Sequence, residues 1–302
     1  MITVEPTGKI LGARVKDVDL SRPLSDEDFR AILVALGTHG VLCFPNQTLT
    51  PAQQRDFSQR LGKIQFSLSG KFNDPEVPEV GTLSNIVENG KPIGLADAGQ
   101  DWHTDMSYTQ TKGYANALYA LKVPRRNGKV LGGTLFGNMY AAYDGLDPAL
   151  KQRLQGATAT HDFNKFWDAM LAKGSARGPL TPEQKAQRPP ATHPIFMVHP
   201  VTGRTSLYCN PGYAMRINGM EKEESDRILN QLFEHQLKPE YLWTHEWTEG
   251  DFLLWDNLCT VHNAIADYTP EEHRLMKRCQ IMADKVFDPA WQQRWVAPRA
   301  AA

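Results

Sequence analysis

The stretch GDFLLWDNLCTVHNA, residues 250–264, shows the pattern from which this chain is built. Its apolar run FLLW is bounded by Gly250 on one side and by Asp256 and Asn257 on the other. A short apolar run bounded by such residues is typical of a buried strand. A second short run, CTV, follows at 259–261 and leads directly into His262. We therefore expect a strand here, followed by a returning strand that carries a histidine.

Similar runs recur along the chain and predict its fold class. They are GVLCFP (40–45), ANALYALKVP (115–124), GGTLFGNM (132–139), PIFMVHP (194–200), TSLYCNP (205–211) and RLMKRCQIMADKV (274–286). Many short strands of this kind indicate an antiparallel sandwich or barrel. Helical spacing of apolar residues and N-terminal capping residues predict helices at 26–39, 51–61 and 221–237, with a shorter helix after Pro148. We expect one mainly β domain over residues 1–302, with flanking helices.

Composition limits the classes of function. The chain has 302 residues, 41% hydrophobic and 22% charged, with a formal net charge of -1. This balance gives no field that would attract nucleic acid or an anionic membrane. The N-terminus does not resemble a secretion signal, and the four cysteines are scattered without a C-x-x-C pair. We expect a cytoplasmic protein with reduced cysteines.

Two stretches rich in glycine, proline and charge are read as long loops, near residues 66–100 and 163–195. Loops of this length within a compact domain are often lids over a binding site. We therefore expect lids at both places.

WHTDMSY, residues 102–108, contains the candidate metal ligands His103 and Asp105. If this stretch is a strand, both side chains point to the same face, because side chains alternate along a strand. His262 is the candidate third ligand. Two histidines and one carboxylate on one side of a metal are typical of non-haem Fe(II) oxygenases. The chain has nine histidines, so a single H-x-D arises easily by chance, and the spacing alone does not decide.

RLMKRCQI begins twelve residues after His262 and adds Arg274 to the candidate site. On a strand that follows the His262 strand, its guanidinium could reach the same cavity and hold a carboxylate through two parallel hydrogen bonds. An arginine taken singly is more often a surface ion-pair partner.

Taken in order, six segments resemble the Fe(II)- and 2-oxoglutarate-dependent dioxygenases of the taurine and 2,4-dichlorophenoxyacetate dioxygenase (TauD/TfdA) family. They cover most of the chain: GVLCFPNQTLTPAQQRDFSQRLG, WHTDMSY, ANALYALKVP, GGTLFGNMYAAYDGL, HPVTGRTSLYCNPGYAMRINGM and WTEGDFLLWDNLCTVHNAIADYTPEEHRLMKRCQI. The resemblance implies a double-stranded β-helix core of the jelly-roll, cupin-like type.

The resemblance also implies roles for individual residues. His103, Asp105 and His262 match the family's iron ligands, and Arg274 and Thr134 match the residues that bind the distal carboxylate of 2-oxoglutarate. Three more residues are candidates for contact with the substrate, namely Arg278, Met106 and Tyr108. Asn210 and Arg216 fall in a family segment close to the site.

The implied reaction is hydroxylation of a C–H bond of a small, anionic organic substrate such as a carboxylate, a sulfonate or an aryloxyalkanoate. Fe(II), 2-oxoglutarate and O2 would be required, and succinate and CO2 would be released. An amino acid or a natural-product intermediate is the alternative substrate. A zinc hydrolase and a binding protein without turnover also remain open. Relatives commonly self-associate, so a homo-oligomer is expected.

Overall fold

The computed structural model describes residues 2–66, 70–174 and 178–296. The first two helices begin where the sequence predicts. In α1 (Asp26–His39), the Ser25 side chain accepts a hydrogen bond from the amide of Asp28. In α2 (Pro51–Leu61), Thr50 and Gln53 form a capping box. Both caps satisfy amides that a helix leaves without internal partners.

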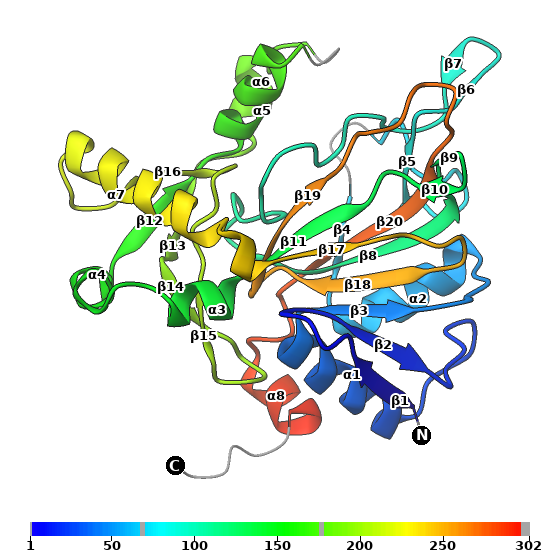
Figure 1. The fold of residues 1–302 in the computed structure, drawn as a ribbon, viewed down its shortest axis with the longest axis horizontal. Coiled ribbons are helices and arrows are strands. Elements are labelled where there is room, and N and C mark those ends of the chain that lie inside the picture. The colour runs from blue at the N-terminus through cyan, green and yellow to red at the C-terminus, as the bar shows by residue number, and fades with distance from the viewer. Residues whose placement is uncertain (1, 67–69, 175–177, 297–302) are drawn as a thin grey trace.

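The largest sheet has eight strands and forms the base of the fold (Figure 1). Its strands pair in antiparallel fashion, except that β2 is parallel to β3. Their spatial order is β1 (Thr3–Pro6), β2 (Ala13–Lys16), β3 (Val41–Phe44), β18 (Phe252–Asp256), β8 (Gly113–Lys122), β20 (Leu275–Met282) and β4 (Ile64–Gln65), with β5 (Gly81–Ser84) also pairing with β20.

A three-stranded sheet packs over one face of this large sheet. Its order is β17 (Leu242–His245), β11 (Thr134–Asn138) and β19 (Thr260–Ala264). The core between the two sheets joins Phe136 of β11 to Leu118, Trp255 and Met276 of the large sheet. Within the described ranges no strand pairing joins the two sheets, so they form a sandwich and not a closed barrel.

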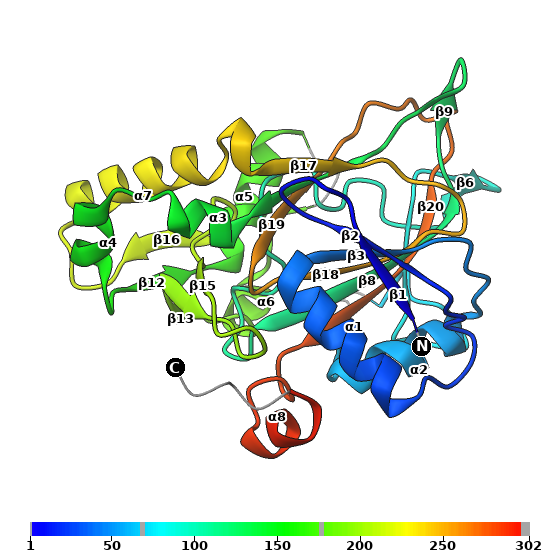
Figure 2. The same ribbon diagram turned by 60° about the horizontal axis from the view of Figure 1, so that its bottom comes forward.

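The opposite face of the large sheet is covered by α1 and α2 (Figure 2). On β8, Leu118 and Ala120 face the small sheet, whereas Ala117 and Tyr119 face the helices. This alternation is the normal period of two for a strand that is buried on both faces. The helix α8 (Pro289–Trp295) joins the same layer through Trp295, which meets Phe29 edge-on.

The remaining elements form a layer beside the sandwich. A second core joins α7 to the strands β12 and β16, through residues such as Leu229, Ala159 and Ile217. The elements of this part are α3 (Met139–Asp144), α4 (Pro148–Leu154), α7 (Lys222–Gln236), η1 (Pro239–Tyr241), β12 (Thr158–His161), β13 (Ala191–Pro194), β14 (Phe196–Val198), β15 (Thr205–Leu207) and β16 (Ala214–Ile217). Two small hairpins pair β6 (Val87–Glu88) with β7 (Lys91–Pro92) and β9 (Arg125–Arg126) with β10 (Lys129–Val130).

The reading of residues 163–195 as a long loop is wrong. The stretch contains α5 (Phe163–Ala172), α6 (Pro182–Ala186) and β13. Asp162 caps α5, and Phe163, Phe166 and Met170 recur at helical spacing on its buried side. That short amphipathic helix was hidden by the glycine and proline that follow it. Residues 66–100 are largely irregular around β5, β6 and β7. Residues 67–69 and 175–177 of the two stretches lie outside the described residues.

The predicted class, mainly β with flanking helices, is confirmed. Every helix in the described ranges is too short or too polar to cross a bilayer.

Candidate metal centre

The three predicted metal ligands meet inside the sandwich. His103 and His262 form an antiparallel bridge in which each amide donates to the other's carbonyl, at 3.0 and 2.8 Å. Their ring centroids lie 4.2 Å apart. One ligand atom from each of His103, Asp105 and His262 lies within 4.8 Å of the other two, and all three residues are buried.

A turn, and not a strand, brings Asp105 to this position. In the stretch 102–108 only His103 pairs with a strand, and the chain turns at 105–108. Met106 has φ of +56°, a left-handed conformation that is uncommon for residues other than glycine. The turn leaves Asp105 Oδ1 3.4 Å from His103 Nε2, and Oδ2 4.0 Å from His262 Nε2. The condition that this stretch is a strand is therefore not met, although the two side chains do meet.

Neighbouring groups fix the orientation of two of the three side chains, His103 and Asp105. His103 Nδ1 lies 2.7 Å from the carbonyl oxygen of Asp101. Because a carbonyl only accepts, Nδ1 is the donor in this contact, and Nε2 is the nitrogen that faces Asp105 and is placed to bind a metal. The side-chain amide of Asn116 donates to Asp105 Oδ2. His103 Nε2 and the Asp105 carboxylate are thus held facing each other.

Charge and burial in the centre favour an ionised Asp105 carboxylate and a neutral His262 imidazole. Burial alone would raise the pKa of Asp105, but the hydrogen bond and charge of His103, with the charge of Arg278, hold that pKa well below its usual range. Burial, together with the neighbouring His103, holds the pKa of His262 well below its ordinary value. These are the protonation states in which both side chains bind metal.

The donor set fits a ferrous ion. Two imidazole nitrogens and one carboxylate oxygen, all on one side, leave the opposite coordination positions open. With bonds of about 2.0 to 2.2 Å to nitrogen and oxygen, adjacent ligand atoms should lie about 3 Å apart. The 3.4 Å between His103 Nε2 and Asp105 Oδ1 needs only a small adjustment to reach that spacing.

Arg274 lies just before β20 and is almost completely buried, with 8% of its surface exposed. Because side chains alternate along a strand, Arg274 lies on the same face as Met276, which belongs to the core between the two sheets. Its Nε has no hydrogen-bond partner among the described residues. Burial lowers the pKa of Arg274, and an interaction with Tyr268 partly opposes this effect. Among the residues that the structure describes, no carboxylate forms an ion pair with this cation.

Gly132 makes room for Arg274. A Cβ on Gly132, whose φ is +68°, would lie 3.1 Å from the Tyr268 ring and 3.3 Å from Cδ of Arg274. Glycine at this position therefore adopts the positive φ without strain and avoids the close contact that a Cβ would make.

Thr134 opens β11, two residues after Gly132, and is buried. It pairs with Ala264, while Phe136 pairs with His262, so the four side chains share one face of the small sheet. The hydroxyl of Thr134 accepts a hydrogen bond of 3.0 Å from the indole of Trp247. The hydroxyl proton is left available for another acceptor.

The three predicted substrate residues lie at different depths. Arg278 is half-buried on the inner face of β20, two residues beyond Met276, and its charge acts on both Asp105 and Tyr108. Tyr108 packs between Phe163 and Tyr213, with ring centroids 4.7 Å from each. Met106 is fully buried and its methyl group lies against Gly113 at the start of β8.

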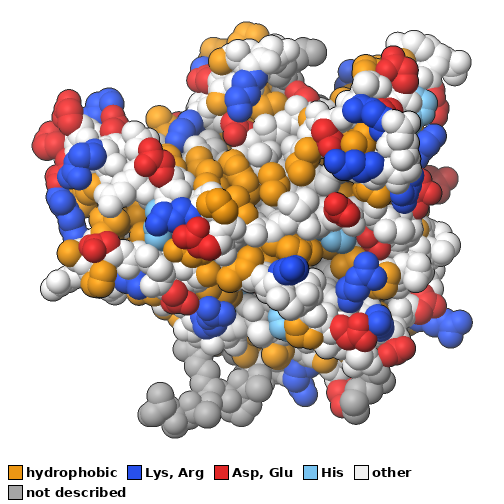
Figure 3. All heavy atoms as spheres, in the orientation of Figure 1, with side chains coloured by type: hydrophobic (Ala, Val, Ile, Leu, Met, Phe, Trp, Pro, Cys, Tyr) orange, Lys and Arg blue, Asp and Glu red, His pale blue; other side chains and the backbone are white. Residues whose placement is uncertain are grey.

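Sequence reasoning missed an aromatic wall at the centre. Phe166 of α5 lies 5.3 Å from His103 between ring centroids, and Tyr213 lies 6.2 Å from it. Both residues belong to a core cluster with Phe163, Met170 and Leu180. The helical spacing of Phe163 and Phe166 could have indicated that cluster. Figure 3 shows hydrophobic side chains gathered at the centre of the molecular face below the α5–α6 projection.

The sequence analysis also missed Asn116 as a residue of the site. A polar residue inside the apolar run ANALYALKV could have indicated it, because buried polar side chains are uncommon. Asn210 lies close to the centre, as expected, because its amide donates to Ser107 Oγ at 2.9 Å. Arg216 is exposed on β16.

Comparison with known proteins identifies the family. Residues 3–280 match the family model described as "Taurine catabolism dioxygenase TauD, TfdA family". The pentalenolactone F synthase of Streptomyces avermitilis is 31% identical over 294 residues, which cover 93% of this chain and 94% of that protein. The (S)-phenoxypropionate/alpha-ketoglutarate-dioxygenase of Sphingobium herbicidovorans is 30% identical over 288 residues, covering 95% and 97% respectively.

A solved structure agrees with these relatives. The crystal structure of AAD-2 in complex with Mn(II) and N-oxalylglycine superimposes with a TM-score of 0.77 at 26% identity, covering 93% of this chain and 97% of that one. N-oxalylglycine is an analogue of 2-oxoglutarate, and Mn(II) stands in for Fe(II). The chain is an oxidoreductase that uses Fe(II), 2-oxoglutarate and O2, and it belongs to the TauD/TfdA family of 2-oxoglutarate-dependent dioxygenases.

Proposed function

We propose that His103, Asp105 and His262 bind the ferrous ion, and that Arg274 and Thr134 bind the distal carboxylate of 2-oxoglutarate. The buried guanidinium of Arg274, which lacks a carboxylate partner in the described part of the chain, is the observation that carries the proposal. A buried cation is stable only when it is paired, and a dicarboxylate supplies the missing anion. Thr134 lies on the same face of its sheet as His262, so it can donate its hydroxyl proton to the same ligand.

When bound, iron and 2-oxoglutarate supply the oxidative chemistry, in which one oxygen atom of O2 enters a substrate C–H bond and the other enters succinate as CO2 is lost. The protein positions these groups and excludes water. His103 and Asp105 are already oriented by Asp101 and Asn116, so little reorganisation is required. Phe166 and Tyr213 cover one side of the centre with apolar surface.

We propose a small substrate with an anionic group and an apolar body. We assign the binding of the anionic group to Arg278, because its charge acts on Asp105 and Tyr108. The apolar body would lie against Tyr108 and the aromatic wall, with Met106 setting the turn beneath it. Carboxylates, sulfonates and aryloxyalkanoates all meet this description.

A natural-product intermediate is the second candidate substrate. Its support is the similarity to pentalenolactone F synthase, at 31% identity over nearly the whole of both chains. An amino acid is less suited to the aromatic wall, because its ammonium group would need a buried partner.

We also propose that the two predicted lids close over the centre. Lys173 at the end of α5 forms an ion pair of 2.8 Å with Asp101, which also holds His103. From the other stretch, the carbonyl of Gly99 accepts from the amide of Ala264. Both stretches therefore touch the elements that carry the ligands, as a closing lid requires.

The proposal extends to the architecture and setting of the protein. We propose that the two packed sheets form a double-stranded β-helix within one domain over residues 1–302, and that the chain works as a homo-oligomer in the cytoplasm. All four cysteines are buried and free, which suits a reducing compartment.

The test is succinate release by the purified protein with Fe(II), 2-oxoglutarate and a panel of small acids. The panel should contain aryloxyalkanoates, alkylsulfonates, amino acids and polycyclic carboxylic acids. Substrate-dependent succinate release with oxygen uptake would support the proposal. Conversion of a panel member with Zn(II), without oxygen uptake and without succinate, would indicate a hydrolase. Calorimetric binding of a panel member without any product would indicate a binding protein.

A further inference from the structure

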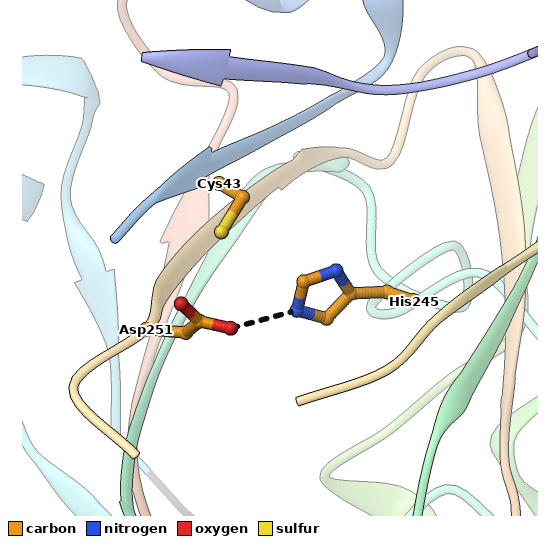
Figure 4. Close-up of side chains that lie close together, drawn as sticks. All are labelled: Cys43, His245 and Asp251. Carbon is orange, nitrogen blue, oxygen red and sulfur yellow. Dashed lines mark ion pairs between the residues drawn. The ribbon is translucent and has the colours of Figure 1, made fainter. Parts of the chain in front are cut away.

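A second group of metal-binding side chains lies away from the ferrous centre (Figure 4). It consists of Cys43 on β3, His245 at the end of β17 and Asp251 just before β18. The exposed fractions of the three residues are 4%, 5% and 2%. Figure 4 shows the sulfur, the imidazole and the carboxylate facing one another. The three residues come from separate segments, and the fold brings them together.

The spacing of the three ligand atoms suits a small cation. All three atoms lie within 4.8 Å of one another, and His245 Nε2 lies 3.4 Å from Asp251 Oδ2. Bonds of about 2.0 Å in tetrahedral geometry place nitrogen and oxygen ligands about 3.3 Å apart, and the longer bond to sulfur widens the remaining edges.

His245 Nε2 is a buried polar atom with no hydrogen-bond partner among the described residues, despite its distance of 3.4 Å from Asp251. Leaving such an atom unsatisfied is unfavourable, because it has lost its hydrogen bonds to water without replacement. Asp251 is held in place, because its Oδ2 accepts from the amide of Thr248 at 2.9 Å. A cation between the two side chains would satisfy the nitrogen without moving the carboxylate.

A groove at the surface reaches two members of this group, Cys43 and His245. It encloses about 260 Å³ and is lined by Cys43 and His245 together with Arg14, Trp243 and Glu246. The groove lies where β2 and β3 of the large sheet approach β17 of the small sheet. An ion can therefore reach the group without the ferrous centre opening.

We propose that Cys43, His245 and Asp251 form a second metal site that binds a zinc-class divalent cation, with water in the fourth position. Thiolate and imidazole favour such ions over magnesium and calcium. On binding, the metal–sulfur bond replaces the S–H bond and the thiol proton passes to solvent.

A nucleophilic role for Cys43 fits the structure less well. Burial and the nearby carboxylate of Asp251 raise the pKa of the Cys43 thiol. A reactive cysteine needs the opposite shift.

The site lies next to the pocket proposed for 2-oxoglutarate. His245 is the cross-strand partner of Thr134, and Trp247, two residues further on, donates to the Thr134 hydroxyl. Occupation of the second site would therefore hold the end of β17 that supports Thr134.

Cobalt(II) added to the metal-free protein distinguishes the two sites. The ligands proposed for the ferrous centre contain no sulfur, so only the second site can give the strong near-ultraviolet absorption of a thiolate bound to Co(II). We expect this absorption to saturate at one equivalent per chain. Zn(II) should remove it by competition, and total zinc bound should be two equivalents per chain.

Three variants test the assignment. Cys43→Ser should abolish the absorption and reduce zinc binding to one equivalent, whereas the matched control Cys209→Ser should retain both. His262→Ala, which removes a ligand from the ferrous centre, should leave the absorption intact. If Cys43→Ser does not fold, His245→Gln keeps the thiol and should weaken cobalt binding at this site by at least tenfold. The proposal is overturned by native protein that shows no thiolate absorption, or by absorption that survives Cys43→Ser or is unaffected by His245→Gln.

Discussion

Asn116 donates a hydrogen bond from its side-chain amide to Oδ2 of Asp105, so a residue on the central strand β8 orients the carboxylate proposed as a metal ligand. Asn116 is fully buried, and its neighbours Ala115 and Ala117 face the opposite side of the sheet. The position of the carboxylate therefore depends on the large sheet and not only on the turn that carries it.

Replacement of Asn116 by alanine should weaken Fe(II) binding about 10- to 100-fold, because the partner that orients a ligating carboxylate is lost. At saturating iron, the KM for 2-oxoglutarate should change little. Titration of the metal-free protein with Fe(II) under anaerobic conditions measures the effect. Asn263→Ala is the control, since Asn263 follows His262 on β19 and points to the other face. Equal iron affinity in native protein and Asn116→Ala would remove the orienting role.

Replacement of Arg274 by alanine should raise the KM for 2-oxoglutarate, because the buried partner of its distal carboxylate is lost. Removing one member of such a pair costs about 2 to 5 kcal/mol, or about 30-fold to several thousand-fold. Iron content should stay unchanged. Arg126→Ala is the control, since Arg126 forms a more exposed ion pair with Glu272. Unchanged cosubstrate kinetics in Arg274→Ala would remove this residue from its proposed role.

Replacement of Arg278 by alanine should selectively impair anionic substrates. We expect kcat/KM for a carboxylate substrate to fall at least tenfold, whereas that for its neutral amide should change little, because only the first loses an ionic partner. Succinate release with the matched pair of substrates measures the difference. An equal loss for acid and amide would indicate that Arg278 shapes the site without recognising charge.

Sequence patterns predicted the strands and most helices because apolar spacing is a local property. Ser25 and Thr50 mark helix starts, and the run ANALYALKVP lies almost entirely within β8. The failure at residues 163–195 has a physical cause. The buried face of α5 consists of only three residues, namely Phe163, Phe166 and Met170. This helical signal was weaker than the loop signal from the glycine and proline that follow.

In the candidate site, too, the sequence predicted the residues of local motifs but not the residues that support them through tertiary contacts. His103, Asp105, His262 and Arg274 were found through their motif, but the support from Asp101 and Asn116 depends on tertiary contacts. WHTD is not a strand, because a single bridge from His103 to His262 replaces a ladder and Met106 then turns the chain. The Cys43, His245 and Asp251 group joins residues up to 208 positions apart (43 to 251), and no local pattern connects them.

Two neighbouring residues of α1 provide a test of the packing. Leu33 is fully buried between the helix and the large sheet, whereas Val34 is 43% exposed. Leu33→Ala should lower the free energy of unfolding by about 2 to 5 kcal/mol, since it removes buried methyl groups and leaves a cavity. Val34→Ala should change it by about 0.5 kcal/mol or less. Urea unfolding of both variants measures the contrast, and similar losses would place α1 differently on the sheet.

His193 should make the protein less stable in mild acid. Burial, followed by the charge of Lys112, lowers the pKa of His193 to about 4, from an ordinary value of 6.5. Between these values the unfolded chain binds a proton that the folded protein excludes, so this residue's contribution is present above pH 6.5 and is lost as the pH falls. The loss should approach about 1.4 kcal/mol per pH unit.

His193→Gln provides the measurement, because glutamine keeps a donor for the carbonyl of Thr109, which lies 3.0 Å from His193 Nε2. Urea unfolding of the metal-free native protein and of the variant, at intervals from pH 7.5 to about pH 4.5, isolates this residue, since other titrating groups are common to both proteins. The variant should be less sensitive to acid, so that the native protein loses more stability below pH 6.5. Parallel curves for the two proteins would mean that His193 takes up its proton as readily in the folded state as in the unfolded chain.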